Sequence, residues 1–121
     1  MDKDQKIYDL EERANKFADR VTDYVLKLPK TTPNVEYGRQ LVRSGGSVGA
    51  NYIEASEGLG VKDFDLHIKI SKKEAKESRH WLRLTRPLPE QEQEKNFLIQ
   101  EATEFILIFS KIINNRKNRN L

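Results

Sequence analysis

Apolar residues recur along the chain at alternating steps of three and four, the spacing of one face of an α-helix. Four such stripes follow one another, separated by short segments with proline or glycine. They predict helices at about residues 4–28, 33–59, 62–85 and 90–115, followed by a basic tail at 116–121. No segment has the strict alternation of a strand. The pattern predicts a single all-α domain over residues 1–121, an antiparallel up-and-down four-helix bundle.

The second predicted helix carries three glycines in its middle, Gly45, Gly46 and Gly49. Each costs a helix interior roughly 1 kcal/mol relative to alanine, so a bare backbone must be needed there. Gly45 and Gly49 form a small-xxx-small pair that allows close helix packing. The expected neighbour is the third helix, whose inward stripe contains small residues at 71, 75 and 78.

A line of polar residues, Ser47, Asn51 and Glu54, lies one position away from the inward stripe of the second helix. Such side chains are half-buried at a helix or subunit contact and need hydrogen-bond partners there. We expect a structural polar network, with Arg43 or a lysine of the third helix as partner. The alternative is a site for a ligand or a partner.

The fourth predicted helix has an apolar run at 105–109 that surrounds it almost completely. One face of this run belongs to the core of the subunit, and the other needs a second cover. In a soluble bundle of this size the simplest cover is another subunit. We therefore predict a homo-oligomer joined through the fourth helix and the glycine-rich second helix.

The net charge is only +3, but residues 62–86 hold eight basic and four acidic residues. Six of the cations are spaced 3, 4, 3, 4 and 3 residues apart, which places them on one line about 25 Å long. Such a line attracts phosphates in a strongly salt-dependent way, although a solvated face is the plainer interpretation. This basic stripe consists of Lys69, Lys72, Lys76, Arg79, Arg83 and Arg86.

The chain offers little for catalysis. It has no cysteine, and its two histidines, His67 and His80, are thirteen residues apart on one predicted helix, hence roughly 20 Å apart. One Glu-x-x-His element, at 77–80, is half of what a di-metal bundle uses. We expect no catalytic residue, no metal and no cofactor, and so no enzyme. No apolar stretch is long enough for a membrane span, and we expect a cytoplasmic protein.

Several strings resemble the four helix bundle protein family encoded within intervening sequences of bacterial 23S ribosomal RNA genes, also labelled S23-like. They are SVGANYIEA at 47–55, KDF at 62–64, EAKESRHWLRL at 74–84 and EATEFILIFSKII at 101–113. The resemblance implies an antiparallel bundle assembled as a ring-shaped homopentamer. It extends to the accessory protein of diversity-generating retroelements, which implies a reverse transcriptase and nucleic acid as partners.

By position, Ser47, Asn51 and Glu54 match the polar signature of the family, and Trp81 matches its third-helix aromatic. Val61 departs from the serine that often caps the third helix, so the start of that helix is expected to depend on Asp63. The predicted function is a non-enzymatic, homo-oligomeric scaffold that binds RNA or DNA non-specifically through the basic stripe. The alternative is a structural or protein-interaction module that binds no nucleic acid.

Overall fold

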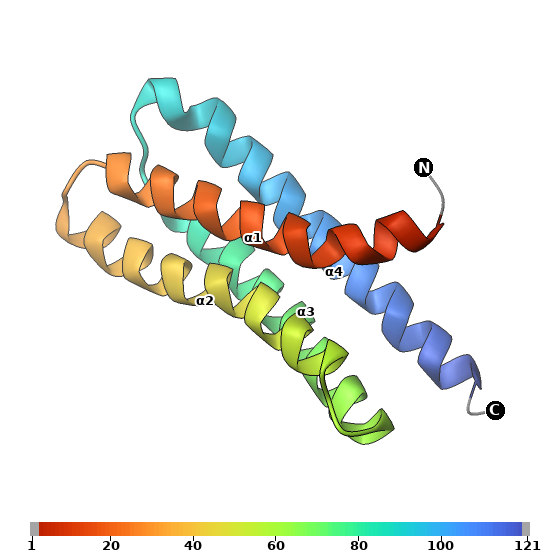
Figure 1. The fold of residues 1–121 in the computed structure, drawn as a ribbon. Coiled ribbons are helices and arrows are strands. Elements are labelled where there is room, and N and C mark those ends of the chain that lie inside the picture. The colour runs from red at the N-terminus through yellow and green to blue at the C-terminus, as the bar shows by residue number, and fades with distance from the viewer. Residues whose placement is uncertain (1–2, 120–121) are drawn as a thin grey trace.

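The computed structural model describes the backbone of residues 3–119 and the side chains of residues 10–118. It contains the helices α1 (Lys3–Lys27), α2 (Thr32–Ser56), α3 (Val61–Leu84) and α4 (Glu92–Arg119), with a 3₁₀ turn, η1 (Pro89–Gln91), before α4. Successive helices run in opposite directions, and both ends of the chain lie at the same end of the bundle (Figure 1). The predicted antiparallel four-helix bundle is confirmed, and residues 3–119 contain no strand.

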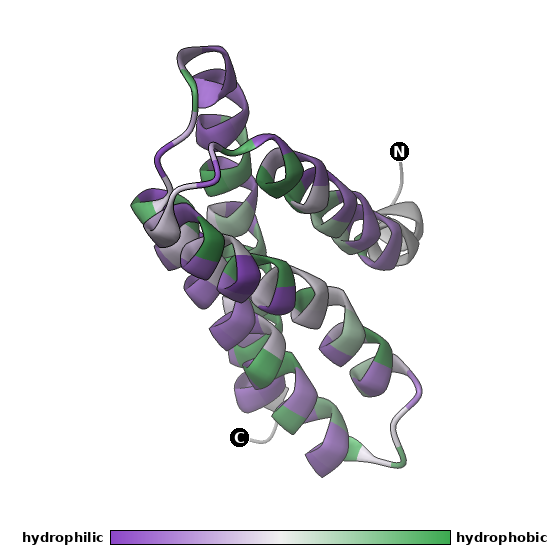
Figure 2. Cartoon of the chain, turned by 90° about the vertical axis from the view of Figure 1, so that its left-hand side faces the viewer, coloured by the Kyte–Doolittle hydropathy of each residue, from purple (hydrophilic) through white to green (hydrophobic). Residues whose placement is uncertain are grey.

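The helices pack in chain order. The largest contact joins α2 to α3, followed by α3 with α4 and α1 with α2, whereas α1 and α4 contact each other least. Hydrophobic and hydrophilic residues alternate along every helix, so each helix has an apolar and a polar side (Figure 2). The bundle is therefore closed tightly along α2–α3–α4 and more loosely between α1 and α4.

The predicted inward stripes form the core. Phe17 and Val21 of α1, Leu41 of α2, Ile68 of α3 and Phe105 of α4 are all buried. The rings of Phe17 and Phe105 meet edge to face, with centroids 5.5 Å apart. Burying one such side chain contributes about 1.5–3 kcal/mol, so the amphipathic stripes specify the packing of the four helices.

Gly45 and Gly49 of α2 face α1 and not α3, which corrects the expectation from the sequence. A Cβ on Gly45 would lie 3.4 Å from Val21, and one on Gly49 would lie 3.2 Å from Ala14, both on α1. The close approach of α3 uses serines instead: Ser78 Oγ donates to Ser44 Oγ over 3.0 Å. Helix α2 therefore has small residues on two faces, glycines toward α1 and Ser44 toward α3. The glycines were identified from the sequence, but Ser44 was not.

Two helix boundaries of α2 differ from the prediction. It begins at Thr32, one residue before the predicted start, and its N-cap is Thr31, whose hydroxyl accepts a hydrogen bond from the amide of Asn34. The helix ends at Ser56, and Leu59, the last residue of the predicted range, is fully exposed. The cause is the turn that follows, where Gly60 adopts a φ of 151° that side-chain-bearing residues rarely adopt.

The ends of α3 and α4 also differ from the prediction. The N-cap of α3 is Gly60, with no side-chain cap, and Asp63 contributes as an acid in the first turn. Helix α3 ends at Leu84, so Arg86 lies just beyond it. Helix α4 continues through Arg119, and residues 116–119 are therefore helical and not a separate tail.

The apolar run of α4 is covered mostly within the subunit. Phe105, Ile106 and Phe109 are buried and Ile108 is half-buried, whereas Leu107 is 59% exposed. The second apolar face expected from the sequence thus reduces to Leu107 on this run. Among the residues described, large exposed side chains are more numerous on α2 and at the α2–α3 turn: Val35, Val42, Ile53, Leu59, Val61 and Leu66.

Candidate nucleic-acid interface

The basic stripe lies on the flank of α3 that faces α4. Its position is shown by Arg79, whose Nη1 donates to Thr103 Oγ1 of α4 over 3.2 Å. Near the end of α3, Lys95 Nζ of α4 donates to the carbonyl of Arg83 over 3.4 Å. At the other end, Lys69 lines a small cavity together with Lys117 of α4. The α3–α4 surface therefore carries the stripe.

Two lysines of α4, Lys95 and Lys117, extend the basic surface. Lys117 belongs to the basic tail predicted at 116–121, whereas Lys95 was not identified from the sequence. Periodicity within one helix reveals which residues of that helix share a face, but it does not reveal how two helices are rotated relative to each other. Lys95 also donates to the carbonyl of Thr85 over 3.0 Å. It thus helps to cap the C-terminus of α3, where a cation is favoured by the helix dipole.

The side chains of the stripe are accessible. Lys69, Lys76, Arg83 and Arg86 are exposed, while Lys72 and Arg79 are half-buried. Half-burial of a long basic side chain covers its aliphatic stem and leaves the charged group in water. All six charged groups of the stripe are thus available to an anion.

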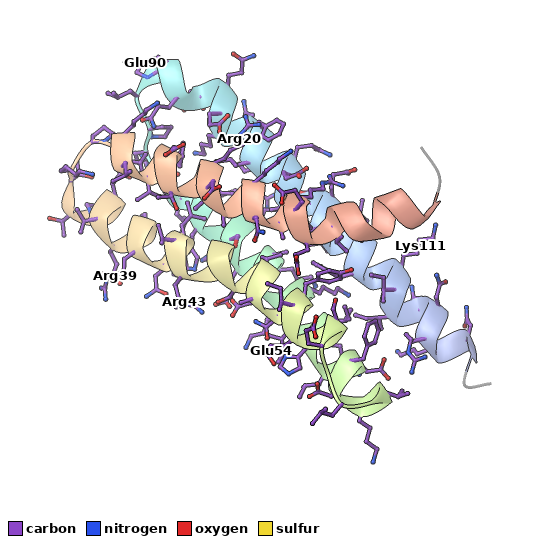
Figure 3. All side chains as sticks on the ribbon, viewed as in Figure 1. Arg20, Arg39, Arg43, Glu54, Glu90 and Lys111 are labelled. Atoms are coloured by element: carbon purple, nitrogen blue, oxygen red, sulfur yellow. The ribbon has the colours of Figure 1, made fainter. Side chains whose placement is uncertain are left out.

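The charge of the stripe is not neutralised by the fold. None of its six members, and neither Lys95 nor Lys117, forms an ion pair with any carboxylate in the described part of the chain. Every other arginine with a described side chain does form one (Figure 3 labels three of them). These five are Arg13, Arg20, Arg39, Arg43 and Arg116.

The acid nearest to the stripe in sequence on the same flank is already engaged. Asp65 lies four residues before Lys69, one turn away on a helix, and Arg116 Nε donates to its Oδ1 over 3.0 Å. The two acids in the middle of α3, Glu74 and Glu77, pair with Arg43 on the opposite flank. The carboxylates of α3 are thus directed away from the stripe or bound by another arginine.

Aromatic rings lie elsewhere. Trp81 is stacked on Tyr37 of α2, with ring centroids 6.0 Å apart. Phe97 is covered by the guanidinium of Arg20 at 3.7 Å, on the side of α4 that faces α1. Phe64, at the start of α3, lies under Arg116. The exposed ring of His80 on α3 lies one turn from Lys76 and contacts Trp81 edge to face. A single imidazole cannot stack successive bases, so in the described part of the chain no row of rings follows the stripe.

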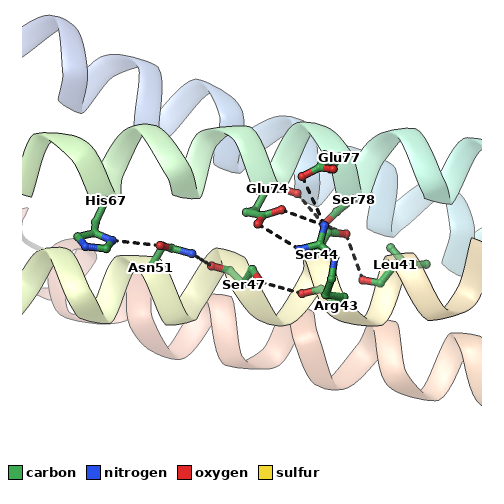
Figure 4. Close-up of polar contacts among 9 residues, drawn as sticks. All are labelled: Leu41, Arg43, Ser44, Ser47, Asn51, His67, Glu74, Glu77 and Ser78. Atoms are coloured by element: carbon green, nitrogen blue, oxygen red, sulfur yellow. Dashed lines mark hydrogen bonds and ion pairs between the residues drawn. The ribbon is translucent and has the colours of Figure 1, made fainter.

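The predicted polar network forms on the other flank of α3, between α2 and α3 (Figure 4). Asn51 Nδ2 donates to the carbonyl of Ser47 over 2.9 Å, which leaves its Oδ1 to accept from His67 Nδ1 at 3.1 Å. Ser47 Oγ donates to the carbonyl of Arg43. Glu54 was predicted in this network, but its side chain is exposed on the last turn of α2 and takes no part in these hydrogen bonds.

Arg43 connects this network to two acids of α3. Its guanidinium lies 3.3 Å from Glu74 and 3.5 Å from Glu77. Burial raises the pKa of Glu74 above its usual value, and the neighbouring carboxyl of Glu77 acts in the same direction, while Arg43 opposes both. His67, which the sequence did not assign to this network, also lies 3.5 Å from Asp63. The arrangement ties α2 to α3 and contains no nucleophile poised beside a base.

No three or more acids and histidines of the described part of the chain are grouped so that they could hold a metal ion. Its helices include none that is both long and apolar enough to cross a membrane.

Comparison with known proteins places these features in context. A family model described as 23S rRNA-intervening sequence protein matches residues 5–111. The crystal structure of a protein of unknown function from the S23 ribosomal protein family of Bacteroides thetaiotaomicron is similar, with a TM-score of 0.73. The two sequences are 28% identical over 86% of this chain and 94% of the other. No curated protein matches the chain. The similarity extends over nearly the whole bundle.

Proposed function

This chain belongs to the family of 23S rRNA-intervening sequence proteins, as its motifs predicted, and we propose that it is a non-enzymatic, homo-oligomeric scaffold that binds RNA or DNA in the cytoplasm. The observation that supports nucleic-acid binding is the contrast between the arginines. Those outside the basic stripe whose side chains the structure describes are paired with carboxylates, while Arg79, Arg83 and Arg86 are not. The three arginines of the stripe therefore keep their charge available for an anion.

Binding of this kind depends on phosphates. Each lysine or arginine that contacts a phosphate releases a condensed counterion, and this release gives affinity without selecting a sequence. Six contacts on a duplex lower the logarithm of the binding constant with a slope of about 5 per decade of salt. The scaffold would therefore bind many sequences at low salt and release them as salt rises.

The homo-oligomer, a pentamer by family resemblance, is supported by the outer face of α2. Gly46 lies in the middle of this helix, and a Cβ there would meet nothing within 4 Å. It is flanked on the same face by Val42 and Ile53, which are 42% and 38% exposed. An exposed mid-helix glycine lowers helix stability without any benefit inside the subunit. Close approach of a second subunit at Gly46 would supply that benefit.

The nucleic-acid function is tested by charge reversal. The double variant Lys72→Glu and Lys76→Glu should abolish binding of labelled RNA and DNA, measured by fluorescence anisotropy over a series of salt concentrations. Lys16→Glu with Lys27→Glu on α1 is the matched control, because both lysines are exposed and the net charge changes equally. Equal loss in both variants would indicate a general charge effect. Unchanged retention in the stripe variant would instead favour a protein-interaction module that binds no nucleic acid.

The oligomer is tested separately by the native mass. Gly46→Leu adds a side chain to the face proposed to join the subunits, and the particle measured by light scattering should become smaller. Asn96→Leu is a control, because Asn96 is exposed on α4 outside that face. A native mass that is the same for wild type and Gly46→Leu would remove α2 from the subunit contact.

A further inference from the structure

We propose that the nucleic acid bound by the basic stripe is a duplex and not a single strand. This inference rests on the proposed function and concerns the class of ligand at the same site. Three features of the protein and the ligand support it. The described α3–α4 surface lacks a row of aromatic rings for stacking bases, its cations lie on a straight line at regular spacing, and a duplex releases more counterions per phosphate contact than a single strand does.

Proteins that hold single strands without sequence preference combine a positive groove with aromatic rings on which successive bases stack. The described α3–α4 surface has the charge but no row of rings on which successive bases could stack, since the exposed His80 is a single imidazole in edge contact with Trp81. Trp81 is turned to α2 and stacked on Tyr37, and Phe97 is covered by Arg20 on the side facing α1. A flexible strand would therefore have to become ordered on this surface through phosphate contacts alone. A duplex arrives with its bases already stacked and its phosphates already fixed.

The stripe is also rigid and straight. Lys69 to Arg83 lie on one unbroken stretch of α3, which spans about 21 Å at 1.5 Å per residue. Arg86 follows just past the helix end, where the side chain of Asn34 holds its backbone amide over 2.8 Å and its carbonyl over 2.9 Å. A row of cations fixed in this way suits a row of phosphates that is fixed as well. Its length corresponds to about seven base pairs at 3.4 Å each.

For the same number of phosphate contacts, the release of condensed counterions favours binding of the duplex over the single strand. The logarithm of the binding constant changes by about 0.9 per phosphate contact on double-stranded DNA and by about 0.7 on a single strand. With six contacts the expected slopes are about 5 and about 4. At low salt this difference strengthens binding of the duplex, and the surface offers no stacking that would compensate a single strand.

The test compares four labelled ligands of about 12 residues per strand: a DNA duplex, an RNA duplex, oligo-dT and oligo-U, the last two chosen because they do not pair. Binding of the full-length protein is measured by anisotropy between about 50 and 200 mM salt. We expect both duplexes, or the one whose phosphate geometry fits, to bind at least about tenfold more tightly than either homopolymer at the lowest salt. The slope should be steeper for the duplex.

Tighter or equal binding of oligo-dT or oligo-U would overturn the duplex inference and leave the proposed function intact. Absence of binding to all four ligands at low salt would instead refute the proposed function itself. The stripe would then be solvated or would bind an acidic protein partner.

A second measurement tests the length of the contact. Lys69→Ala with Arg86→Ala removes the two ends of the stripe, and both side chains are exposed, so the fold should persist. The variant should lower the salt slope for a duplex of about 12 base pairs by about 2, roughly 1 per cation. A hairpin with a stem of about four base pairs is shorter than the stripe, and its affinity should change little. Equal effects on both lengths would contradict an extended contact.

Discussion

The side chain of Asn34 brackets the backbone of Arg86. Asn34 Oδ1 accepts from the amide of Arg86 over 2.8 Å, and Asn34 Nδ2 donates to the carbonyl of the same residue over 2.9 Å. Nδ2 also donates to the carbonyl of Pro29 over 3.0 Å. One buried amide at the start of α2 thus joins the α1–α2 loop to the segment after α3 and fixes the last cation of the basic stripe.

Replacing Asn34 by alanine should destabilise the protein by about 2–3 kcal/mol, because a buried backbone amide and two carbonyls lose their partner. Urea unfolding measures this loss. Asn96→Ala serves as the control, since Asn96 is exposed and its replacement should change stability by no more than about 0.5 kcal/mol. Equal losses in the two variants would show that the bracket contributes nothing specific.

The glycines of α2 should respond to alanine in opposite directions. At Gly46 the new methyl group meets nothing within 4 Å, so in dilute protein the gain in helix propensity should raise stability by up to about 1 kcal/mol. At Gly38 the methyl group would lie 2.9 Å from Val25 Cγ1, and stability should fall. Thermal unfolding of both variants measures the difference, and equal gains would mean that α1 retreats from Gly38 at no cost.

The ion pair between Arg13 and Glu101 should stabilise the weakest contact of the bundle. Two parallel bonds of 2.7 Å join these side chains across α1 and α4. Because Arg13 is partly exposed, a double-mutant cycle with alanine should give a coupling near the upper end for surface pairs, about 1 kcal/mol. The exposed Arg39–Glu36 pair within α2 is the reference and should couple more weakly. A larger coupling energy for Arg39–Glu36 than for Arg13–Glu101 would refute the stabilising role given to the pair between α1 and α4.

The stability of the protein should depend on pH through Glu74. Its pKa is raised in the folded state by burial and by the carboxyl of Glu77, so the folded chain binds the proton more tightly than the unfolded chain does. The free energy of unfolding relative to Glu74→Gln should therefore be greatest below the usual pKa of 4.5 and fall as pH rises through the raised value.

Urea unfolding of wild type and Glu74→Gln between about pH 4 and 8 checks this sign. Removing the opposing cation by Arg43→Gln should enlarge the fall, since Arg43 favours the ionised form of Glu74. A stability difference that rises with pH would show that Arg43 outweighs burial.

Much of the fold could be predicted because it depends on periodicity. Positions such as Phe17 and Phe105 repeat at helical spacing, and both are buried. The predictions that were wrong concern features that depend on contacts with particular neighbours in the folded chain. Thr31 and Thr32 are equally good caps in sequence, and only the hydrogen bond to Asn34 distinguishes them. Glu54 continues the polar line of Ser47 and Asn51 in sequence, but its side chain is exposed on the last turn of α2.

The candidate site shows the same limit. The six cations of the basic stripe were identified from their spacing on one predicted helix, and the structure places five of them on one flank of α3 and Arg86 just beyond its end. Lys95 and Lys117 come to this surface from α4, through a rotation between helices that no single-helix pattern contains. The ion pairs that neutralise the other arginines likewise join residues far apart in sequence, as in Arg13–Glu101.

Helix α3 separates charge across its width, with Glu74 and Glu77 on the flank toward α2 and the unpaired cations on the flank toward α4. Because Arg43 pairs with both acids, the unpaired charge of α3 lies on its α4 flank. In the field of a polyanion this off-axis positive charge is attracted first, which turns the α4 flank forward before contact is made. The encounter would thus be aligned in advance, and the apolar face of α2 would remain turned aside.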